Sequence, residues 1–100
     1  MEISKSNKKD KRLKATFEDG DVVHFGSKGS STYVDHGDST KRTNYLRRHG
    51  NNPLERKYFN NPEKHFKTPS VLSKEILWGK SKDIGDNVAL FKKKYLHSRL

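Results

Sequence analysis

Histidine is the residue type in this 100-residue chain with the widest chemical range, because imidazole binds metal ions and transfers protons near neutral pH. The five histidines are His24, His36, His49, His65 and His97. No two of them have the i, i+4 spacing of a helical metal site, His-Glu-x-x-His is absent, and no carboxylate stands among them at ligand spacing. The spacing therefore predicts no metal site.

Nuclease and nucleophilic chemistry also lack a recognisable pattern. A His-Asn-His nuclease could use His49, Asn60 or Asn61, and His65, but the adjacent histidine pair and flanking cysteine pairs that mark such enzymes are missing. The chain has no cysteine, which excludes disulfides, thiolate nucleophiles and cysteine-based zinc sites. We therefore predict a protein that is not an enzyme, uses no cofactor and takes no small-molecule substrate.

A glycine- and serine-rich segment at residues 25–31 could contact a phosphate group. Its glycines would let backbone N–H groups approach an anion, and Lys28 would add a positive charge. The G-x-x-x-x-G-K-[ST] pattern of nucleoside-triphosphate hydrolases is missing. A single phosphate contact at Lys28 stays open, and nucleotide hydrolysis is not predicted.

Positive charge is concentrated in two blocks of the sequence. Lys and Arg number 22 against 12 Asp and Glu, a net charge of +10, and residues 41–48 and 91–100 each contain four basic residues and no acidic one. Such blocks favour anionic partners, namely nucleic acid, an acidic membrane surface or an acidic protein face. The candidate contacts are Lys28, Arg42, Arg47, Arg48, Lys92, Lys93 and Lys94. The three consecutive lysines also have the sign that suits a helix C-terminus, so a purely structural interpretation of them stays open.

The strands that would position these residues are predicted in the N-terminal part. Residues 12–17 alternate apolar and polar side chains, Gly20 suits a tight turn, and residues 22–25 resume an apolar, β-branched run. This pattern predicts a β-hairpin whose inner face carries Leu13, Ala15, Phe17, Val23 and Phe25. Tyr33 and Val34 could add a short third strand.

Helices are predicted in the rest of the chain. The expected segments are residues 41–49, capped by Asp38 or Ser39 and ended by Gly50; residues 53–59, opened by Asn52-Pro53; residues 69–78, opened by Thr68-Pro69 and ended by Gly79; and a last helix from about residue 83 with an apolar stripe of Ile84, Val88, Phe91 and Tyr95. Residues 60–68 are expected to form an irregular connector. The predicted fold class is α+β, an N-terminal β-hairpin or small three-stranded antiparallel sheet followed by three to four short helices.

Composition bounds the domain organisation. We expect residues 1–10 to be a basic flexible arm and residues 11–100 a single small α+β domain with a basic C-terminal helix. Because only 29% of residues are hydrophobic, either the core is small or a partner completes it. No apolar run approaches the roughly 18 residues of a membrane-spanning helix, and residues 1–10 lack the apolar stretch of a signal peptide. The expectation is a protein that neither spans a membrane nor is secreted by that route.

Two aromatic residues allow more than one interpretation. Tyr45 could stack on a nucleic-acid base from within the basic helix, or it could anchor that helix to the core, which the scarcity of other apolar residues there favours. Trp78 could cover the hairpin as a core residue or lie at an interface with a partner.

Three sequence blocks carry a resemblance to a known family. They are Val23-His24-Phe25-Gly26-Ser27-Lys28-Gly29; the spaced residues Tyr33, His36, Asp38, Arg42, Tyr45, Arg48 and His49; and Ile76-Leu77-Trp78-Gly79-Lys80. The chain in this respect resembles a family of small basic proteins of unknown function from nucleocytoplasmic large DNA viruses of algae and protists. It departs from that pattern at Ser30, where an aromatic is common, and in a longer connector at residues 51–62. The resemblance implies a viral setting and no catalytic residues.

Two hypotheses about function follow. The first is a small basic structural protein of a virus particle, a minor capsid or internal component that bridges larger viral structural proteins or an anionic surface, present in the virion and in the host cytoplasm during assembly. The alternative is a nucleic-acid-binding protein that packages or regulates the viral genome through the basic residues of both blocks.

Overall fold

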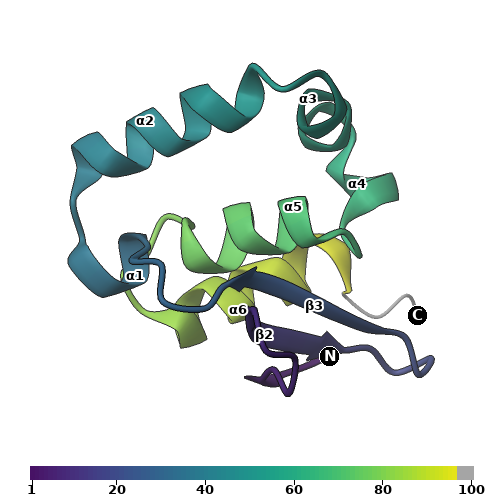
Figure 1. Ribbon diagram of the computed structural model, residues 1–100. Helices are drawn as coiled ribbons and strands as arrows, with labels where there is room; N and C mark the ends of the chain where they lie inside the picture. The colour runs from purple at the N-terminus through teal and green to yellow at the C-terminus, as the bar shows by residue number, and fades with distance from the viewer. Residues whose placement is uncertain (97–100) are drawn as a thin grey trace.

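The computed structural model describes residues 1–96 and has an α+β fold, a three-stranded antiparallel sheet followed by short helices (Figure 1). The strands are β1 (Glu2–Lys5), β2 (Lys11–Thr16) and β3 (Val22–Ser27). The helices are α1 (Tyr33–His36), α2 (Ser39–Gly50), α3 (Pro53–Asn60), α4 (Pro62–His65), α5 (Pro69–Leu72), the π-helix η1 (Ser73–Leu77) and α6 (Ile84–Tyr95). The predicted fold class is confirmed; His97 and Arg99 lie outside the described residues.

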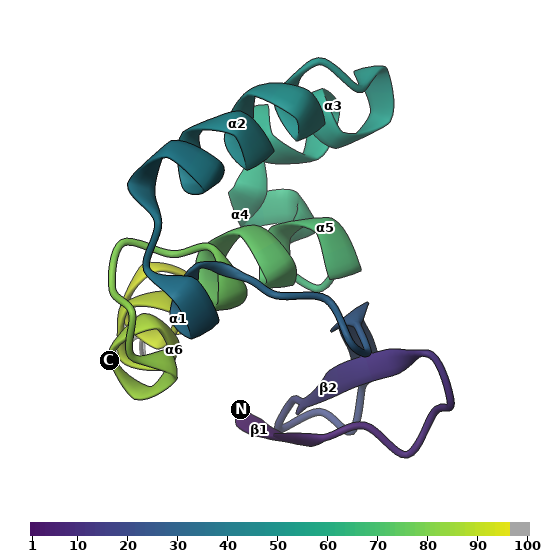
Figure 2. The same ribbon diagram turned by 60° about the vertical axis from the view of Figure 1, so that its left-hand side comes forward.

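The helices form layers over the sheet. In Figures 1 and 2, α2 lies in a layer above α5, and the sheet lies on the other side of α5. Within residues 1–96, no helix has both the length and the apolar character needed to cross a bilayer.

The hairpin of β2 and β3 has the predicted apolar face. Leu13 pairs with Phe25 and Ala15 with Val23, so the alternating apolar residues share one face of the sheet. The Phe17 N–H donates to the Asp21 carbonyl at 2.9 Å and closes the turn, in which Gly20 takes a φ of 95°. This conformation is costly for any residue with a Cβ, which explains the glycine.

Part of the segment expected to be a flexible arm is a strand instead. β1 pairs antiparallel with β2 and places Ile3 opposite Ala15, while Met1 and Ile3 pack against the core. The Ser6 N–H extends the pairing by donating to the Arg12 carbonyl at 3.1 Å. An edge strand is stabilised largely by backbone hydrogen bonds, so a polar segment with a single inward apolar residue can form one.

The third strand predicted at Tyr33 and Val34 is wrong, because these residues begin α1. The Thr32 N–H and hydroxyl donate to the Asp35 carboxylate at 2.7 and 2.8 Å and form a capping box. This local signal outweighs the β-propensity of a tyrosine and a valine, and β1 takes the third position in the sheet.

Two of the predicted helix starts are confirmed by their caps. The Asp38 side chain accepts from the Thr40 and Lys41 N–H groups at the start of α2, and the Asn52 side chain accepts from two N–H groups at the start of α3. The expected end of this helix at residue 49 is one residue too early: Gly50 is the last residue of α2, and the cap residue is Asn51 in the right-handed region.

The segment expected to be one helix over residues 69–78 is α5 followed by η1. The Trp78 N–H donates to the Ser73 carbonyl at 3.0 Å, the i to i−5 bond of a π-turn. The Asn87 amide donates to the Ile76 carbonyl at 2.9 Å, and a Cβ at position 79 would overlap the Glu75 carbonyl, so only glycine fits there. The connector expected to be irregular contains the short helix α4.

The core is small, and its residues form one cluster. Its fully buried members are Ala15, Phe17, Phe25, Val71, Leu72, Ile76, Leu77 and Phe91. The remaining residues of the α6 stripe and Trp78 are half-buried at its edge. The exposed large apolar side chains among residues 1–96 are Val22, Leu54 and Leu90, which lie on three separate elements.

Candidate functional site

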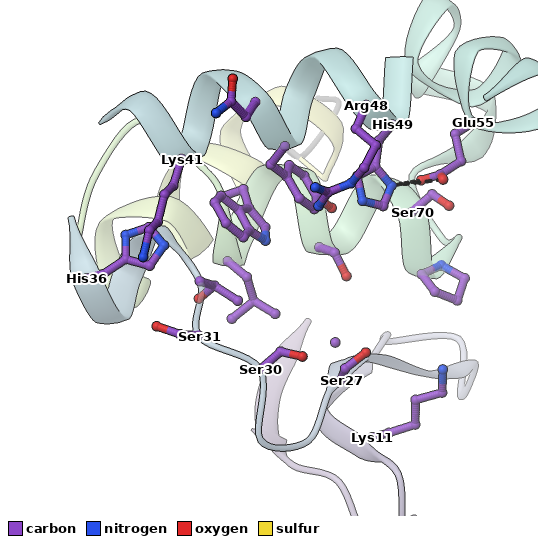
Figure 3. Close-up of a pocket in the computed structure, with 18 residues that line it drawn as sticks. Lys11, Ser27, Ser30, Ser31, His36, Lys41, Arg48, His49, Glu55 and Ser70 are labelled. Carbon is purple, nitrogen blue, oxygen red and sulfur yellow. Dashed lines mark hydrogen bonds and ion pairs between the residues drawn. The ribbon is translucent and has the colours of Figure 1, made fainter. Parts of the chain in front are cut away.

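A cleft of about 600 Å³ lies between α2, the loop that connects β3 to α1, and the α5–η1 segment. Figure 3 shows Lys41, Arg48 and His49 projecting from α2, with Ser27, Ser30 and Ser31, from the end of β3 and the loop after it, on the other side and Ser70 on α5 between them. Lys11 reaches the cleft from the start of β2. The size lies within the range of about 300–1,000 Å³ found for ligand sites in proteins.

Arg42 holds α2 in place over this cleft. Its Nε atom donates to the carbonyl oxygens of Trp78 and Gly79 at 3.0 and 3.1 Å, and its guanidinium lies 5.6 Å from the centre of the Tyr33 ring. The π-turn leaves these two carbonyls outside the helical bonding pattern. Arg42 was a predicted anion contact, and the structure gives it contacts that join α2 to the end of η1.

A stack of rings forms the α2 wall of the cleft. The Tyr45 ring lies parallel to the Trp78 ring with centroids 4.2 Å apart, and the His49 ring is 4.1 Å from Tyr45 on the same helix. Tyr45 is 7% exposed, and burial raises the pKa of its phenol well above the ordinary value. Tyr45 is therefore the core anchor of α2, the interpretation that the sequence favoured, and its ring is not open for stacking on a base.

Two histidines at the cleft use their Nδ1 atoms in opposite ways, one as a hydrogen-bond donor and the other as an acceptor. His49 Nδ1 lies 2.8 Å from both carboxylate oxygens of Glu55, and since a carboxylate only accepts, Nδ1 carries a hydrogen. His36 Nδ1 accepts from the Asp38 N–H at 2.8 Å, so a neutral His36 ring carries its hydrogen on Nε2. Within residues 1–96 that Nε2 atom is buried without a hydrogen-bond partner, and the ring meets Trp78 edge to face at 5.5 Å.

The sequence analysis missed the pair of His49 and Glu55. The two residues lie six positions apart, on α2 and α3, and they meet only because the short link at Asn51 and Asn52 turns one helix against the other. The available signal was the Asn-Pro start of α3, which fixes Glu55 in the first turn of that helix.

Most lysines and arginines of residues 1–96 have no carboxylate within 4 Å, and the cations of the cleft are among them. Lys11, Lys41 and Arg48 line the cleft, and none is within 4 Å of a carboxylate of residues 1–96. Elsewhere the Arg12 guanidinium donates two hydrogen bonds, of 2.7 and 2.8 Å, to the Asp35 carboxylate. These bonds hold the pKa of that carboxyl well below its usual range. The cleft thus keeps cationic groups that the protein itself does not neutralise.

The other predicted contact residues lie outside the cleft. Arg47 is exposed on α2 but does not line it, and Lys28 is exposed on the loop after β3, its N–H donating to the Asp10 carbonyl. Lys92 and Lys93 are exposed on the last turn of α6. Lys94 donates to Glu75 at 3.0 Å beside a second hollow of about 150 Å³. The structure does not gather the seven predicted residues into one site.

No group of three or more histidine, cysteine, aspartate or glutamate side chains in the part of the chain that the structure describes could hold a metal ion. The two histidines of the cleft are paired with an acid and a backbone amide rather than with each other.

Comparison with known proteins gives one match. Residues 1–49 are similar to a family described as "Family of unknown function (DUF5754)". No curated protein and no solved structure matches the chain. The matched residues supply the sheet, the loop after β3, α1 and nearly all of α2, which includes Lys11, Lys41 and Arg48, whereas Glu55 and the α5–η1 side of the cleft lie beyond them. The family carries no assigned activity, and the viral setting stays a prediction.

Proposed function

We propose that this protein binds nucleic acid and that α2 with the cleft beneath it supplies the phosphate contacts. The observation that carries the proposal is the set of cations on one helix without acidic residues: Lys41, Arg47 and Arg48 have no carboxylate partner among residues 1–96. Lys11 adds a fourth such cation on the facing strand. Neutralising phosphates with such groups releases condensed counterions, which is the main source of sequence-independent affinity.

The backbone supports these cations rigidly. α2 is capped by Asp38 at its start, bonded by Arg42 to the end of η1, and packed by Tyr45 on Trp78. A helix fixed at three points keeps the backbone positions of its exposed cations fixed relative to one another, so that no backbone entropy is lost when a polyanion binds.

A salt titration tests the proposal. Full-length protein should bind single-stranded and duplex oligonucleotides with an affinity that falls steeply between about 50 and 200 mM salt. Changing Arg47 and Arg48 together to alanine should lower the slope of log K against log salt by about 2. The matched control is the double change of Lys92 and Lys93 to alanine, which also removes two exposed cations but from α6.

Two results would contradict the proposal: no binding at low salt, or the same slope for the α2 variant as for the wild-type protein. A slope lowered only by the α6 variant would move the contact surface to that helix and would equally reject the assignment to α2.

The role of a virion structural protein stays a prediction, based on the low hydrophobic content, the basic segments at both ends of the chain and the resemblance to a viral family. Its test is whether the protein is found in purified particles and remains with the shell after the genome is removed.

A further inference from the structure

Serine hydroxyls gather at the cleft without partners of their own. Ser27, Ser30, Ser31, Ser70 and Ser73 all line it, and none of these hydroxyls makes a hydrogen bond to another group of residues 1–96. Among the other serines of residues 1–96, the hydroxyl of Ser6 lies 2.7 Å from His24 Nδ1 and that of Ser81 donates to Asp86 at 3.1 Å, whereas the hydroxyls of Ser4 and Ser39 have no such partner. The cleft therefore offers hydrogen-bond donors from both of its sides.

The same cleft combines these donors with uncompensated positive charge. Arg48 and Lys41 come from α2 and Lys11 from the sheet side. The one acidic residue in the lining is Glu55, and both of its oxygens lie 2.8 Å from His49 Nδ1. Cations and hydroxyl donors without a competing carboxylate are the groups that bind a compact anion with several acceptor oxygens.

The aromatic residues of the cleft restrict the kind of contact that a ligand can make there. Tyr45 packs on Trp78 at 4.2 Å and on His49 at 4.1 Å, so these rings are used in packing one another. A ligand in the cleft would accordingly be held by its anionic group rather than by stacking of a base.

We infer that the cleft binds a phosphomonoester, either the terminal phosphate of a nucleic-acid strand or the phosphate of a free nucleotide. This inference rests on the proposed function and names the chemical group that the α2 site prefers. A phosphomonoester carries a charge of about −1.5 to −2 near neutral pH and three acceptor oxygens, more of both than a phosphodiester within a strand. Arg48 supplies the charge from α2, and the loop serines on the other side of the cleft supply further donors. Lys41, about 10 Å away along the helix axis, adds to the positive potential of the cleft.

The test compares one single-stranded oligonucleotide with a 5′-phosphate and with a 5′-hydroxyl, at constant ionic strength. We expect the phosphorylated strand to bind about tenfold more tightly, the effect of one or two charge-assisted hydrogen bonds. Arg48→Ala should abolish this preference. Arg47→Ala is the matched control, because it removes a neighbouring exposed arginine of the same helix that does not line the cleft; it should weaken both strands equally and keep the preference.

A second arm separates the two sources of the phosphate. Adenosine monophosphate, with adenosine as its control, competes against the 5′-phosphorylated strand. Competition by the monophosphate alone supports a free nucleotide as ligand, and a 5′-phosphate preference without competition supports the end of a strand. Equal binding of the two strands, with no effect of the monophosphate, overturns the inference while leaving nucleic-acid binding intact. Failure of both strands to bind overturns the proposed function instead.

Discussion

The two basic blocks look equivalent in the sequence, but the structure gives them different surroundings. The block on α2 lies over a cleft, on a helix packed through Tyr45 and Arg42, and its exposed cations Arg47 and Arg48 have no acidic partner among residues 1–96. The described part of the other block is the last turn of α6, where Lys94 is bonded to Glu75.

This difference shows that charge density along a chain does not by itself identify a contact surface. Lys92, Lys93 and Lys94 are explained by the negative end of the helix dipole and by one acidic neighbour. On α2, Arg47 and Arg48 also lie in the last turn, where the helix dipole favours positive charge, but Lys41 lies in the first turn. Positive charge at a helix start opposes the dipole, and at Lys41 this is offset by the carboxylate of the cap residue Asp38, whose pKa the hydrogen bond from the Lys41 N–H and the charge of Lys41 help to lower.

The largest expected effect concerns the anchoring of α6. Phe91 is fully buried and packs against Phe66 and Tyr95, so Phe91→Ala should lower the free energy of unfolding by about 3–5 kcal/mol. Urea unfolding followed by circular dichroism measures this. Leu90→Ala, one position away and 41% exposed, is the control and should change stability by less than about 0.5 kcal/mol. Similar small effects of both changes would show that α6 is not held by the core.

The next effect concerns the anchoring of α2. Trp78 is half-buried and carries the stack on Tyr45, so Trp78→Ala should cost about 3 kcal/mol, the lower end of the range for large aromatic residues. Near-ultraviolet circular dichroism of the tyrosines should change with it, because Tyr45 loses its stacked neighbour. An unchanged melting temperature together with loss of ligand binding would mean that Trp78 is an interface residue instead.

A smaller effect separates the two kinds of arginine on α2. Arg42→Ala removes charge-assisted bonds to two carbonyls and should cost about 1.5–3 kcal/mol of stability. Arg47→Ala should cost less than about 0.5 kcal/mol but should reduce the salt slope of nucleic-acid binding by about 1. Chemical unfolding and binding titrations on both variants measure the contrast. The comparison fails if Arg42→Ala is as stable as Arg47→Ala.

Local signals in the sequence were sufficient for much of the fold. The alternation around Ala15 predicts the hairpin, and the caps Asp38, Asn52 and Thr68 predict three helix starts, since each pattern depends on neighbouring residues. The wrong predictions concern segments whose structure depends on contacts with residues far away in the sequence. β1 forms because β2 offers an unpaired edge, and the π-turn before Trp78 is accompanied by a bond from Asn87 eleven residues away from its acceptor.

The candidate site was predicted only in part for the same reason. The basic character of α2 is visible in the sequence, as is the serine-rich loop, but nothing local shows that the loop faces the helix. That arrangement follows from Arg42 and the ring stack, which join residues more than thirty positions apart. The same contacts explain why Arg42 and Arg48, close together on one helix, have different surroundings.

The smallest effect tests whether one lysine of α6 is structural. Burial disfavours the charged Glu75, but the bond from Lys94 and the charge of Lys74 outweigh it and hold the pKa of Glu75 below its ordinary value. A carboxyl whose pKa is lowered by folding stabilises the protein above its ordinary pKa of about 4.3, and this contribution disappears as the pH falls through the lowered value. Lys94→Ala should therefore cost about 0.5–1 kcal/mol more at pH 7 than near pH 2, measured by unfolding at both values. Lys93→Ala, whose lysine has no carboxylate partner among residues 1–96, should lose only the interaction with the helix dipole, about 0.3 kcal/mol, and lose it equally at both pH values. Equal losses for both variants would mean that the lysines of α6 act through the helix dipole alone, and the structural distinction between Lys94 and its neighbour would have to be abandoned.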